Sequence, residues 1–440
     1  MDRLVEFSIE HLYGLYNHNI SFDSSESVAI LHGPNGVGKT AILKCINYLL
    51  SCNFSELRKL PYSKINATLS NGVHFKLIRV GVGTNDLLMR AVDPSQKLSV
   101  EVFYKGQLQL DYTFVGEPDN VGSDIPPWYR RMSDTHYMDE TSGEIYSSEY
   151  LFKKFSKASV KPKDRKNLAT IKAMLGVVKV HLVEANRLYT AVEGTWPKPK
   201  SSRMRFSVQE CSDFIVGLIS VAQNNYGKTA QVLDQSFPHR FISDIDRPME
   251  VYEIKERLKI ISGKLAVLMK IGLLDAENFK YFDPESLDGV DQNKARIMDL
   301  YVRDSEEKLA VFDDLALKIK LLLNSLNKKF KNKEVFLNKD SGLAVRGPKG
   351  LELPLESLSS GEQHEMVLLS ELLFKVPYGT LVLIDEPELS LHVKWQREFL
   401  PELISIAHQV GFVAIIATHS PFIVGERFDL MVSLDPGADE

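Results

Sequence analysis

Cysteine and long apolar runs are the two features that this 440-residue sequence most clearly lacks. Its three cysteines, Cys45, Cys52 and Cys211, have the spacing of neither a disulfide framework nor a metal site. So little cysteine fits a reducing compartment. No apolar run approaches the roughly 18 residues that a membrane-spanning helix needs. The N-terminal residues do not resemble a signal peptide, so we expect a soluble, cytoplasmic protein.

An excess of positive charge is also missing. The 53 Lys and Arg residues against 58 Asp and Glu residues give a net charge of -5, so no global field attracts nucleic acid or a membrane. Local basic clusters occur at Lys153, Lys154, Lys157, Lys161, Lys163, Arg165 and Lys166; at Lys198, Lys200, Arg203 and Arg205 beside Trp196; and at Lys328, Lys329, Lys331 and Lys333. The first two clusters could hold DNA or RNA phosphates, or they could be solvated surface. Nucleic acid therefore stays open as a partner, and no membrane partner is expected.

One segment fits the phosphate-binding pattern G-x-x-x-x-G-K-[ST] in full. It consists of Gly33, Pro34, Asn35, Gly36, Val37, Gly38, Lys39 and Thr40. The glycines allow a tight curl in which successive N–H groups face one anion. Lys39 is expected to reach the β- and γ-phosphates of a nucleotide, and the Thr40 hydroxyl to ligate Mg²⁺.

The flanks of this segment match the mechanism. Residues 27–31 predict a short buried strand that enters the loop. Residues 40–51 predict a helix with one apolar side, and its N-terminus would point at the phosphates. Strand, loop and helix in this order predict a phosphate-binding loop.

Alternating apolar residues predict β-structure in the first third of the chain. The expected strands are 5–9, 20–22, 73–80, 98–103 and 108–114. Lys105-Gly106 is a hairpin signal, so the last three should form an antiparallel meander after the P-loop helix. Tyr13 and Tyr16 could stack on an adenine or simply pack at a sheet edge. Residues 116–150 are rich in Gly, Pro, Asp and Ser, which predicts surface loops.

The middle of the chain has helical periodicity, over about residues 206–275 and 293–331. Within it, residues 252–274 and 299–330 each carry apolar residues three or four positions apart. Such helices are roughly 30 to 45 Å long and could pair as a short antiparallel hairpin. Heptads are not sustained, which excludes a long coiled-coil arm.

Two buried strands in the last third end in polar residues that suit phosphate chemistry. Residues 380–384 are apolar and end in Asp385 and Glu386, a Walker B arrangement. Asp385 could hold Mg²⁺ through water, and Glu386 could polarise a water in line with the γ-phosphate. Residues 411–417 form a second such strand, followed by His419, which could bond the γ-phosphate and orient that water.

A third strand, residues 177–183, runs into Asn186 and Arg187. A polar residue just beyond a central strand is well placed to meet a nucleotide or its metal. The alternative is a loop that contains a structural arginine.

A second anion site is predicted at Leu358-Ser-Ser-Gly-Glu-Gln363, where small residues precede a helix over about 364–374. Its members are Ser359, Ser360, Gly361 and Glu362. One subunit has no need of two phosphate cradles for one nucleotide. We therefore expect this segment to serve a nucleotide bound to another copy.

Together the motifs GPNGVGKT, LSSGEQ, LVLIDEPELSLH and ATHSP resemble an ABC-type ATPase head. Within that class, the sequence resembles the branch of SMC and break-repair ATPases, and it resembles the stand-alone ATPases of bacterial phage-defence systems more closely. Three details resemble the ATPase subunits of PARIS and Septu systems, and they resemble the PARIS (AriA) type more closely. These details are Pro387 to His392, Trp395-Gln396 and SFPHR at 236–240. The resemblance is specific over roughly residues 1–50 and 350–425.

The resemblance implies ATP and Mg²⁺ as ligands and a role for each matching residue. Lys39 and Thr40 fall on the Walker A lysine and Mg²⁺ ligand. Asp385 falls on the Walker B aspartate, Glu386 on the catalytic glutamate and His419 on the switch histidine.

The signature motif of the family falls on Ser359 and Gly361 with their neighbours, and it contacts ATP of the opposite subunit. Ser360 stands where transporters usually have glycine. Residues 390–392 occupy the D-loop. Asn186 takes the place of the Q-loop glutamine with a shorter side chain, as a candidate metal ligand.

The fold class that follows is α/β: an ABC-ATPase head, with a P-loop core in a mixed sheet, an antiparallel meander and an inserted helical subdomain. We expect an N-terminal lobe over 1–190, a helical insertion over 191–345 and a C-terminal lobe over 346–440.

The function implied is an ATPase, hydrolysing ATP to ADP and phosphate, that closes head to head with its own copy and controls a separate effector. The chain has no nuclease constellation, so the effector would be a nuclease encoded alongside. PARIS-like relatives further imply a larger homo-oligomer and a phage-encoded trigger protein. The alternative is an SMC-like DNA-repair or DNA-clamping ATPase that binds DNA itself. A transporter subunit fits poorly, given the large insertion and the EPELSLH form.

Overall fold

The computed structural model describes most of the chain. The described residues are 3–22, 25–81, 97–114, 129–131, 136–139, 145–147, 167, 169–171, 173–174, 178–185, 187–191, 204–243, 249–274, 283–287 and 289–434. They belong to two units, one formed by Met1–Arg205 with Lys375–Glu440 and the other by Phe206–Phe374. Each unit is described by itself below. The three-part division expected from the sequence stays a prediction.

A five-stranded sheet forms the centre of the first unit. Its order is β11 (Lys179–Val183), β17 (Thr380–Asp385), β18 (Val413–Thr418), β3 (Val28–His32) and β19 (Met431–Ser433). All four pairings are parallel. Every residue of β17 is buried, which explains why this strand reads as a continuous apolar run rather than an alternating one.

The register of this sheet brings distant parts of the chain to one edge. Asp385 at the end of β17 lies opposite Ala417 of β18, and Thr418 lies opposite His32 of β3. Parallel strands present their carboxyl ends at the same edge. The residues that follow β3, β17 and β18 therefore emerge side by side.

Helix α1 (Lys39–Leu50) follows β3 directly and buries an apolar side that includes Ile42, Leu43 and Ile46. These residues share one core with β1, β4, β5 and β17. The helix expected after the P-loop is thus confirmed. The same unit also contains α2 (Phe54–Leu57), α11 (Val393–Val410), α12 (Pro421–Val424) and η7 (Phe428–Leu430).

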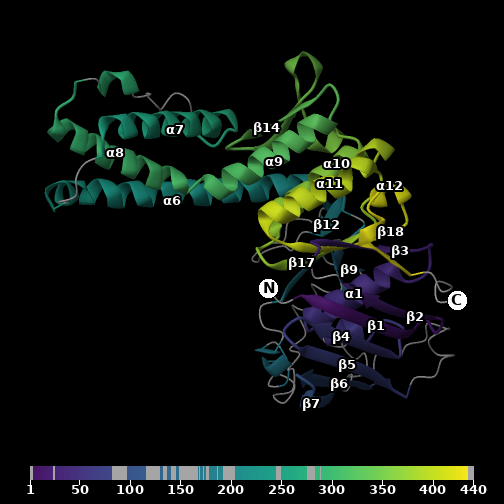
Figure 1. The fold of residues 1–440 in the computed structure, drawn as a ribbon. Coiled ribbons are helices and arrows are strands. Elements are labelled where there is room, and N and C mark those ends of the chain that lie inside the picture. The colour runs from purple at the N-terminus through teal and green to yellow at the C-terminus, as the bar shows by residue number, and fades with distance from the viewer. Residues whose placement is uncertain are drawn as a thin grey trace. The chain divides into compact units, whose positions relative to one another are not determined.

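A six-stranded antiparallel sheet forms the rest of this unit's core, and Figure 1 shows its strands in succession below α1. Its order is β2 (Tyr16–Ser21), β1 (Leu4–Leu12), β4 (Lys64–Leu69), β5 (Val73–Val80), β6 (Lys97–Tyr104) and β7 (Gln107–Phe114). The predicted meander and its hairpin at Lys105-Gly106 are confirmed. Strand β4 was missed, although its burial alternates strictly. It joins the meander to β1, so the meander and the first two strands form a single sheet.

The segment expected to be loops, 116–150, lies mostly outside the described residues. Its described parts form three short strands, β8 (Tyr129–Arg131), β9 (His136–Asp139) and β10 (Ile145–Ser147), paired antiparallel. The loop prediction is wrong for these ten residues. Two further short strands, β12 (Tyr189–Ala191) and β13 (Met204–Phe206), pair with each other.

Helices dominate the second unit, as predicted. They are α6 (Ser207–Ser243), α7 (Val251–Lys270), α8 (Gln292–Ala310) and α9 (Asp313–Lys329), with the short η3 (Pro284–Leu287). Figure 1 shows α6, α7 and α8 alongside one another.

The pairing of these helices corrects the expected hairpin between residues 252–274 and 299–330. Ion pairs join Arg257 to Glu306 and Lys264 to Asp313, so α7 runs in the same direction as α8 and α9. The antiparallel partner of α8 is α6, which is tied to it by the Arg240–Asp304 and Lys308–Asp234 pairs. The antiparallel pair is thus formed by α6 and α8, and not by residues 252–274 and 299–330.

The remainder of the second unit is a small sheet and the helix that carries the expected signature. Strands β14 (Glu334–Asn338), β15 (Gly342–Arg346) and β16 (Glu352–Leu353) pair antiparallel. Two short turns, η4 (Pro348–Gly350) and η5 (Leu355–Ser357), precede α10 (Ser360–Ser370), and η6 (Glu371–Lys375) follows it. None of the described helices combines the length and the apolar character needed to span a membrane.

Candidate functional site

The loop between β3 and α1 has the tight backbone that the glycine pattern predicts. Gly36 and Gly38 adopt φ values of +94° and +97°, a region that side chains disfavour. A Cβ on Gly38 would also collide with the Leu12 side chain, whereas one on Gly36 would meet open space. Gly38 is therefore required twice, for its backbone conformation and for its close approach to β1.

Lys39 opens α1 and is buried. Its ammonium donates hydrogen bonds to the carbonyls of Gly33 (2.7 Å) and Pro34 (3.1 Å) and lies 3.9 Å from Glu386 Oε1. The first-turn N–H groups of a helix have no partner within the helix. Loop, lysine and helix N-terminus together make a donor set that fits a polyphosphate.

Thr40, the next residue, meets the end of β17. Its hydroxyl donates to Asp385 Oδ1 and Oδ2, at 2.9 and 3.0 Å. Burial raises the pKa of Asp385 above its ordinary value, and the bond from Thr40 partly offsets this. A hydroxyl beside a carboxylate is an all-oxygen pair of the kind Mg²⁺ prefers. These two residues could therefore hold the metal that accompanies a nucleotide.

A cavity of ≈ 200 Å³ adjoins this pair and is lined by Thr40, Leu43, Lys44, Leu182, Glu184, Ala185 and Asp385. It lies beside the end of β11, where the sequence predicted a metal-contacting residue. Asn186 itself lies outside the described residues, so its role as a metal ligand stays a prediction. Arg187 is buried and donates to the carbonyls of Glu184 and Asp385, which supports the structural alternative for this arginine.

Glu386 follows Asp385 and has an unusual backbone. Its φ of +42° is rare for a residue with a side chain, and its N–H donates to the Ala417 carbonyl at 2.9 Å. Such strain recurs at functional sites. Burial, with a further contribution from the neighbouring Glu388, raises the pKa of Glu386 to about 7, and His419 partly opposes the shift. A carboxylate with a pKa near neutrality suits a general base.

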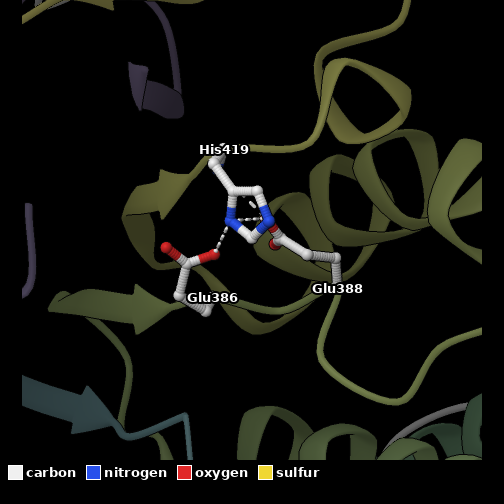
Figure 2. Close-up of side chains that lie close together, drawn as sticks. All are labelled: Glu386, Glu388 and His419. Atoms are coloured by element: carbon white, nitrogen blue, oxygen red, sulfur yellow. Dashed lines mark hydrogen bonds and ion pairs between the residues drawn. The ribbon is translucent and has the colours of Figure 1, made fainter. Parts of the chain in front are cut away.

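His419 lies against the carboxylate of Glu386. Its Nδ1 is 2.6 Å from Glu386 Oε2 and 3.2 Å from Glu388 Oε1. Figure 2 shows the imidazole facing both carboxylates. The ligand atoms of these three side chains all lie within 4.8 Å of one another. The fold therefore brings together the two residues that the sequence predicted to act on water, Glu386 and His419.

Glu388 is the member of this cluster that sequence reasoning missed. It is buried, and its Oε1 accepts hydrogen bonds from the Thr418 hydroxyl, the His419 N–H (3.0 Å) and the Ser420 N–H (3.1 Å). The only signal in the sequence was a second glutamate two residues after the first. Nothing in that spacing specifies a partner in the following strand.

The D-loop residues follow Glu388. Ser390 has a φ of +64°, Leu391 is buried, and His392 is the N-cap of α11, accepting from the Lys394 N–H at 3.2 Å. The segment is thus a tight turn fixed at its end by a helix cap.

The aromatic pair proposed for the adenine lies near the loop but is engaged in packing. Tyr13 and Tyr16 both pack against the core of the first unit. The Tyr16 ring stacks on His18 at 5.9 Å, and His18 Nε2 is 2.9 Å from the Val37 carbonyl. These contacts favour the packing alternative, and a role on adenine stays a prediction.

The expected signature lies in the second unit at the start of α10. Ser359 is its N-cap and forms a capping box with Glu362: the Ser359 N–H donates to Glu362 Oε2 at 2.9 Å, and the Glu362 N–H donates to Ser359 Oγ at 3.4 Å. Ser359 and Ser360 are exposed and Gly361 is half-buried. Small exposed residues at a helix N-terminus fit the predicted anion site.

Lys333 holds the Glu362 side chain, since its ammonium lies 2.8 Å from both carboxylate oxygens. Burial raises the pKa of Glu362, but Lys333 and Ser359 outweigh it and hold that pKa below its ordinary value. Lys329 pairs in turn with buried Glu365 one turn further along α10. Two of the four lysines in the third basic cluster are thus bound to carboxylates of α10.

Two family models match this chain. Residues 233–425 match one described as "AAA domain, putative AbiEii toxin, Type IV TA system", and residues 7–120 match one described as "AAA domain". Two stretches of the chain are thus similar to AAA-type ATPase domains. The second holds the phosphate-binding loop, and the first holds Asp385, Glu386 and His419.

Two solved structures are similar over 98% of this chain and 93% of their own. One is the Smc head domain with an extended coiled coil bound to the C-terminal domain of ScpA, from Pyrococcus furiosus, at 12% identity and a TM-score of 0.34. The other is the SmcHead bound to the C-winged helix domain of ScpA, at 10% identity and a TM-score of 0.33. TM-scores of this size support no argument of their own.

Proposed function

We propose that this protein binds ATP with Mg²⁺ and hydrolyses it to ADP and phosphate at the carboxyl edge of its parallel sheet. The observation that carries the proposal is the contact of 2.6 Å between His419 Nδ1 and Glu386 Oε2. Lys39 Nζ is 3.9 Å from the other oxygen of Glu386, which supports a general base next to the bound phosphates. The ATPase domain matches over residues 7–120 and 233–425 support the same reading.

In the proposed reaction, each residue of the site has a separate role. Lys39 and the loop N–H groups bind the β- and γ-phosphates, and Thr40 and Asp385 hold the metal, which would neutralise phosphate charge. Glu386 takes a proton from a water aligned with the terminal phosphorus, so that the water oxygen attacks as the bond to the β–γ bridging oxygen breaks. His419 keeps the Glu386 carboxylate in place through its hydrogen bond.

The hydrolysis itself is tested with the pair Glu386→Gln and Glu356→Gln. Glu356 lies in the second unit, outside the described site, and serves as the matched control. Steady-state phosphate release should fall in Glu386→Gln and persist in Glu356→Gln. Equal rates in the two variants would reject the assignment of the base.

We further propose that two copies close on two ATP molecules, with Ser359 to Glu362 of each copy binding the nucleotide of the other. The exposed, capped N-terminus of α10 supports this, because it presents an anion site that a single nucleotide bound at Lys39 does not require.

Light scattering tests this closure. Glu386→Gln should double in mass on addition of Mg²⁺ and ATP, because binding persists without turnover. A second substitution, Ser359→Arg, should keep it monomeric, while the control Ser220→Arg on α6 should not. Doubling in the Ser359→Arg variant would contradict the role of the signature.

Beyond ATP hydrolysis, we propose that the protein acts as a sensor or scaffold that controls a separate nuclease in antiphage defence. The support is the PARIS-like form of the EPELSLH segment and of residues 236–240. Tagged Glu386→Gln, purified with ATP from cells that carry its neighbouring genes, should bring down a stoichiometric protein with nuclease motifs. Lys39→Ala is the control, since it should not close.

Direct DNA binding is the competing function. The engagement of Lys329 and Lys333 with α10 carboxylates weighs against the third basic cluster as a DNA contact. Duplex binding that weakens steeply with salt would favour this alternative, because phosphate contacts release counterions.

A further inference from the structure

The position of His419 depends on its backbone more than on the packing of its ring. The His419 side chain is 43% exposed, whereas its neighbours Thr418 and Ser420 are buried. An imidazole with this much solvent around it has few apolar contacts to restrain it. Besides its contact with Glu388 Oε1, its place on the Glu386 carboxylate therefore depends on the loop that carries it, residues 418–420.

Glu388 holds this loop. A single carboxylate oxygen accepts from three donors in consecutive residues, the Thr418 hydroxyl and the N–H groups of His419 and Ser420. Bonds to a charged acceptor are stronger than bonds between neutral groups. Because Glu388 lies two residues beyond Glu386, it ties the loop to the chain segment that carries the base.

Gln396 bonds to the same loop at Ser420. Its Oε1 accepts from the Ser420 hydroxyl at 2.8 Å, and its Nε2 donates to the Leu391 carbonyl at 3.0 Å. The second bond fixes which way the amide faces, so the oxygen is directed at Ser420. Gln396 belongs to the first turn of α11, and its own N–H bonds to the His392 carbonyl at 3.1 Å.

We propose that Glu388 and Gln396 are positioning residues for ATP hydrolysis: both bond to the loop of residues 418–420 and so keep the His419 imidazole on the Glu386 carboxylate. The inference rests on the proposed function. Gln396 also bonds to the Leu391 carbonyl, so it joins this loop to residues 390–392.

Kinetics test the first part of this inference. Gln396→Ala should lower kcat about ten- to a hundredfold with KM for ATP unchanged, because misplacing a catalytic group slows the chemical step without weakening substrate binding. Gln409→Ala, on the exposed end of α11, is the matched control and should leave kcat unchanged. Glu388→Gln keeps an oxygen that can accept the three bonds, so it should retain most of the rate that Glu388→Ala loses.

A double-mutant cycle tests whether Gln396 acts through Ser420. Ser420→Ala removes the hydroxyl from the link, and Gln396→Ala removes its acceptor. If they are two ends of one connection, the double variant should be no slower than the worse single variant. Losses in kcat that multiply in the double variant would overturn the connection.

A readout that needs no turnover separates this inference from the proposed function. Histidine ring carbons are labelled in the full chain, and the His419 resonance among the 11 histidines is assigned by its loss in His419→Gln. The resonance should move in Gln396→Ala and stay in place in Gln409→Ala. A wild-type protein without ATPase activity would reject the proposed function, yet a moved resonance would still support the positioning role. An unmoved His419 resonance in Gln396→Ala would overturn it.

Discussion

The Thr40 hydroxyl bonds to both carboxylate oxygens of Asp385, at 2.9 and 3.0 Å, across 345 positions of sequence. The pairing arises because Thr40 lies in the first turn of α1, the helix that follows β3, while Asp385 ends β17 of the same parallel sheet. This pair of oxygen-bearing side chains would hold the Mg²⁺ that accompanies the nucleotide in the proposed function.

Removing the hydroxyl should impair use of the metal. We expect Thr40→Ala to raise the Mg²⁺ concentration for half-maximal ATP hydrolysis about tenfold or more, with a smaller change in Thr40→Ser, which keeps the hydroxyl. Titration of the ATPase rate with Mg²⁺ measures both. Equal Mg²⁺ dependence in wild type and Thr40→Ala would show that Thr40 does not hold the metal.

The two left-handed glycines of the loop should differ in what they tolerate. Gly36→Ala should cost about 1–2 kcal/mol in the free energy of unfolding, from backbone strain alone. Gly38→Ala adds a collision with Leu12 and should cost about 1–3 kcal/mol more. Urea unfolding without nucleotide measures the difference. Equal losses would contradict the close packing of the loop on β1.

The buried pair of Lys329 and Glu365 predicts a strong asymmetry in the second unit. Their side chains are only 2% and 1% exposed. Lys329→Ala leaves a buried carboxylate without this partner and should destabilise the protein by about 3–5 kcal/mol, whereas the double change Lys329→Met with Glu365→Leu should cost much less. Thermal and urea unfolding report both, with exposed Lys331→Ala as the control. A harmless Lys329→Ala would contradict the burial of the pair.

Glu362 predicts a pH dependence of stability. Its folded pKa is held below the ordinary value of 4.5, chiefly by Lys333 and Ser359 acting against burial. A carboxylate with a depressed pKa stabilises the fold above its unfolded pKa, and this contribution is lost as pH falls through the folded value.

Glu362→Gln should therefore be less stable than wild type at pH 7, and the gap should narrow as the pH falls below the ordinary pKa of 4.5. Urea midpoints at pH 7 and pH 3.5 measure it. Glu352→Gln, exposed in the same unit, is the control. A gap that stays constant with pH would show that the charge on Glu362 is not what stabilises the fold.

Much of this architecture could be predicted from the sequence because the relevant signals are local. The glycines before Lys39 and the apolar strand before Asp385 can each be recognised within a window of about ten residues. Parallel strands then bring their carboxyl ends together without further information. Motif and topology therefore suffice to place Lys39, Asp385, Glu386 and His419 at one edge.

The remainder depends on pairings that a single sequence does not encode. Glu388 and Gln396 reach the loop at Thr418 and Ser420 from 30 and 24 positions away, and any buried polar residue could have been the partner. The direction of α7 relative to α8, which the Arg257–Glu306 pair reports, is not specified by amphipathic periodicity. Strand β4 was missed because six alternating residues next to a turn are a weak signal.

The most direct test of the account uses Glu386→Gln, with Lys39→Ala beside it. We predict that Glu386→Gln binds ATP as tightly as wild type and hydrolyses it about 10²–10⁴-fold more slowly, because only the base is lost. Lys39→Ala should fail to bind. Equilibrium binding of ATP and single-turnover hydrolysis measure the two steps separately. Hydrolysis by Glu386→Gln at the wild-type rate would contradict the central claim that Glu386 at the end of β17 activates the water.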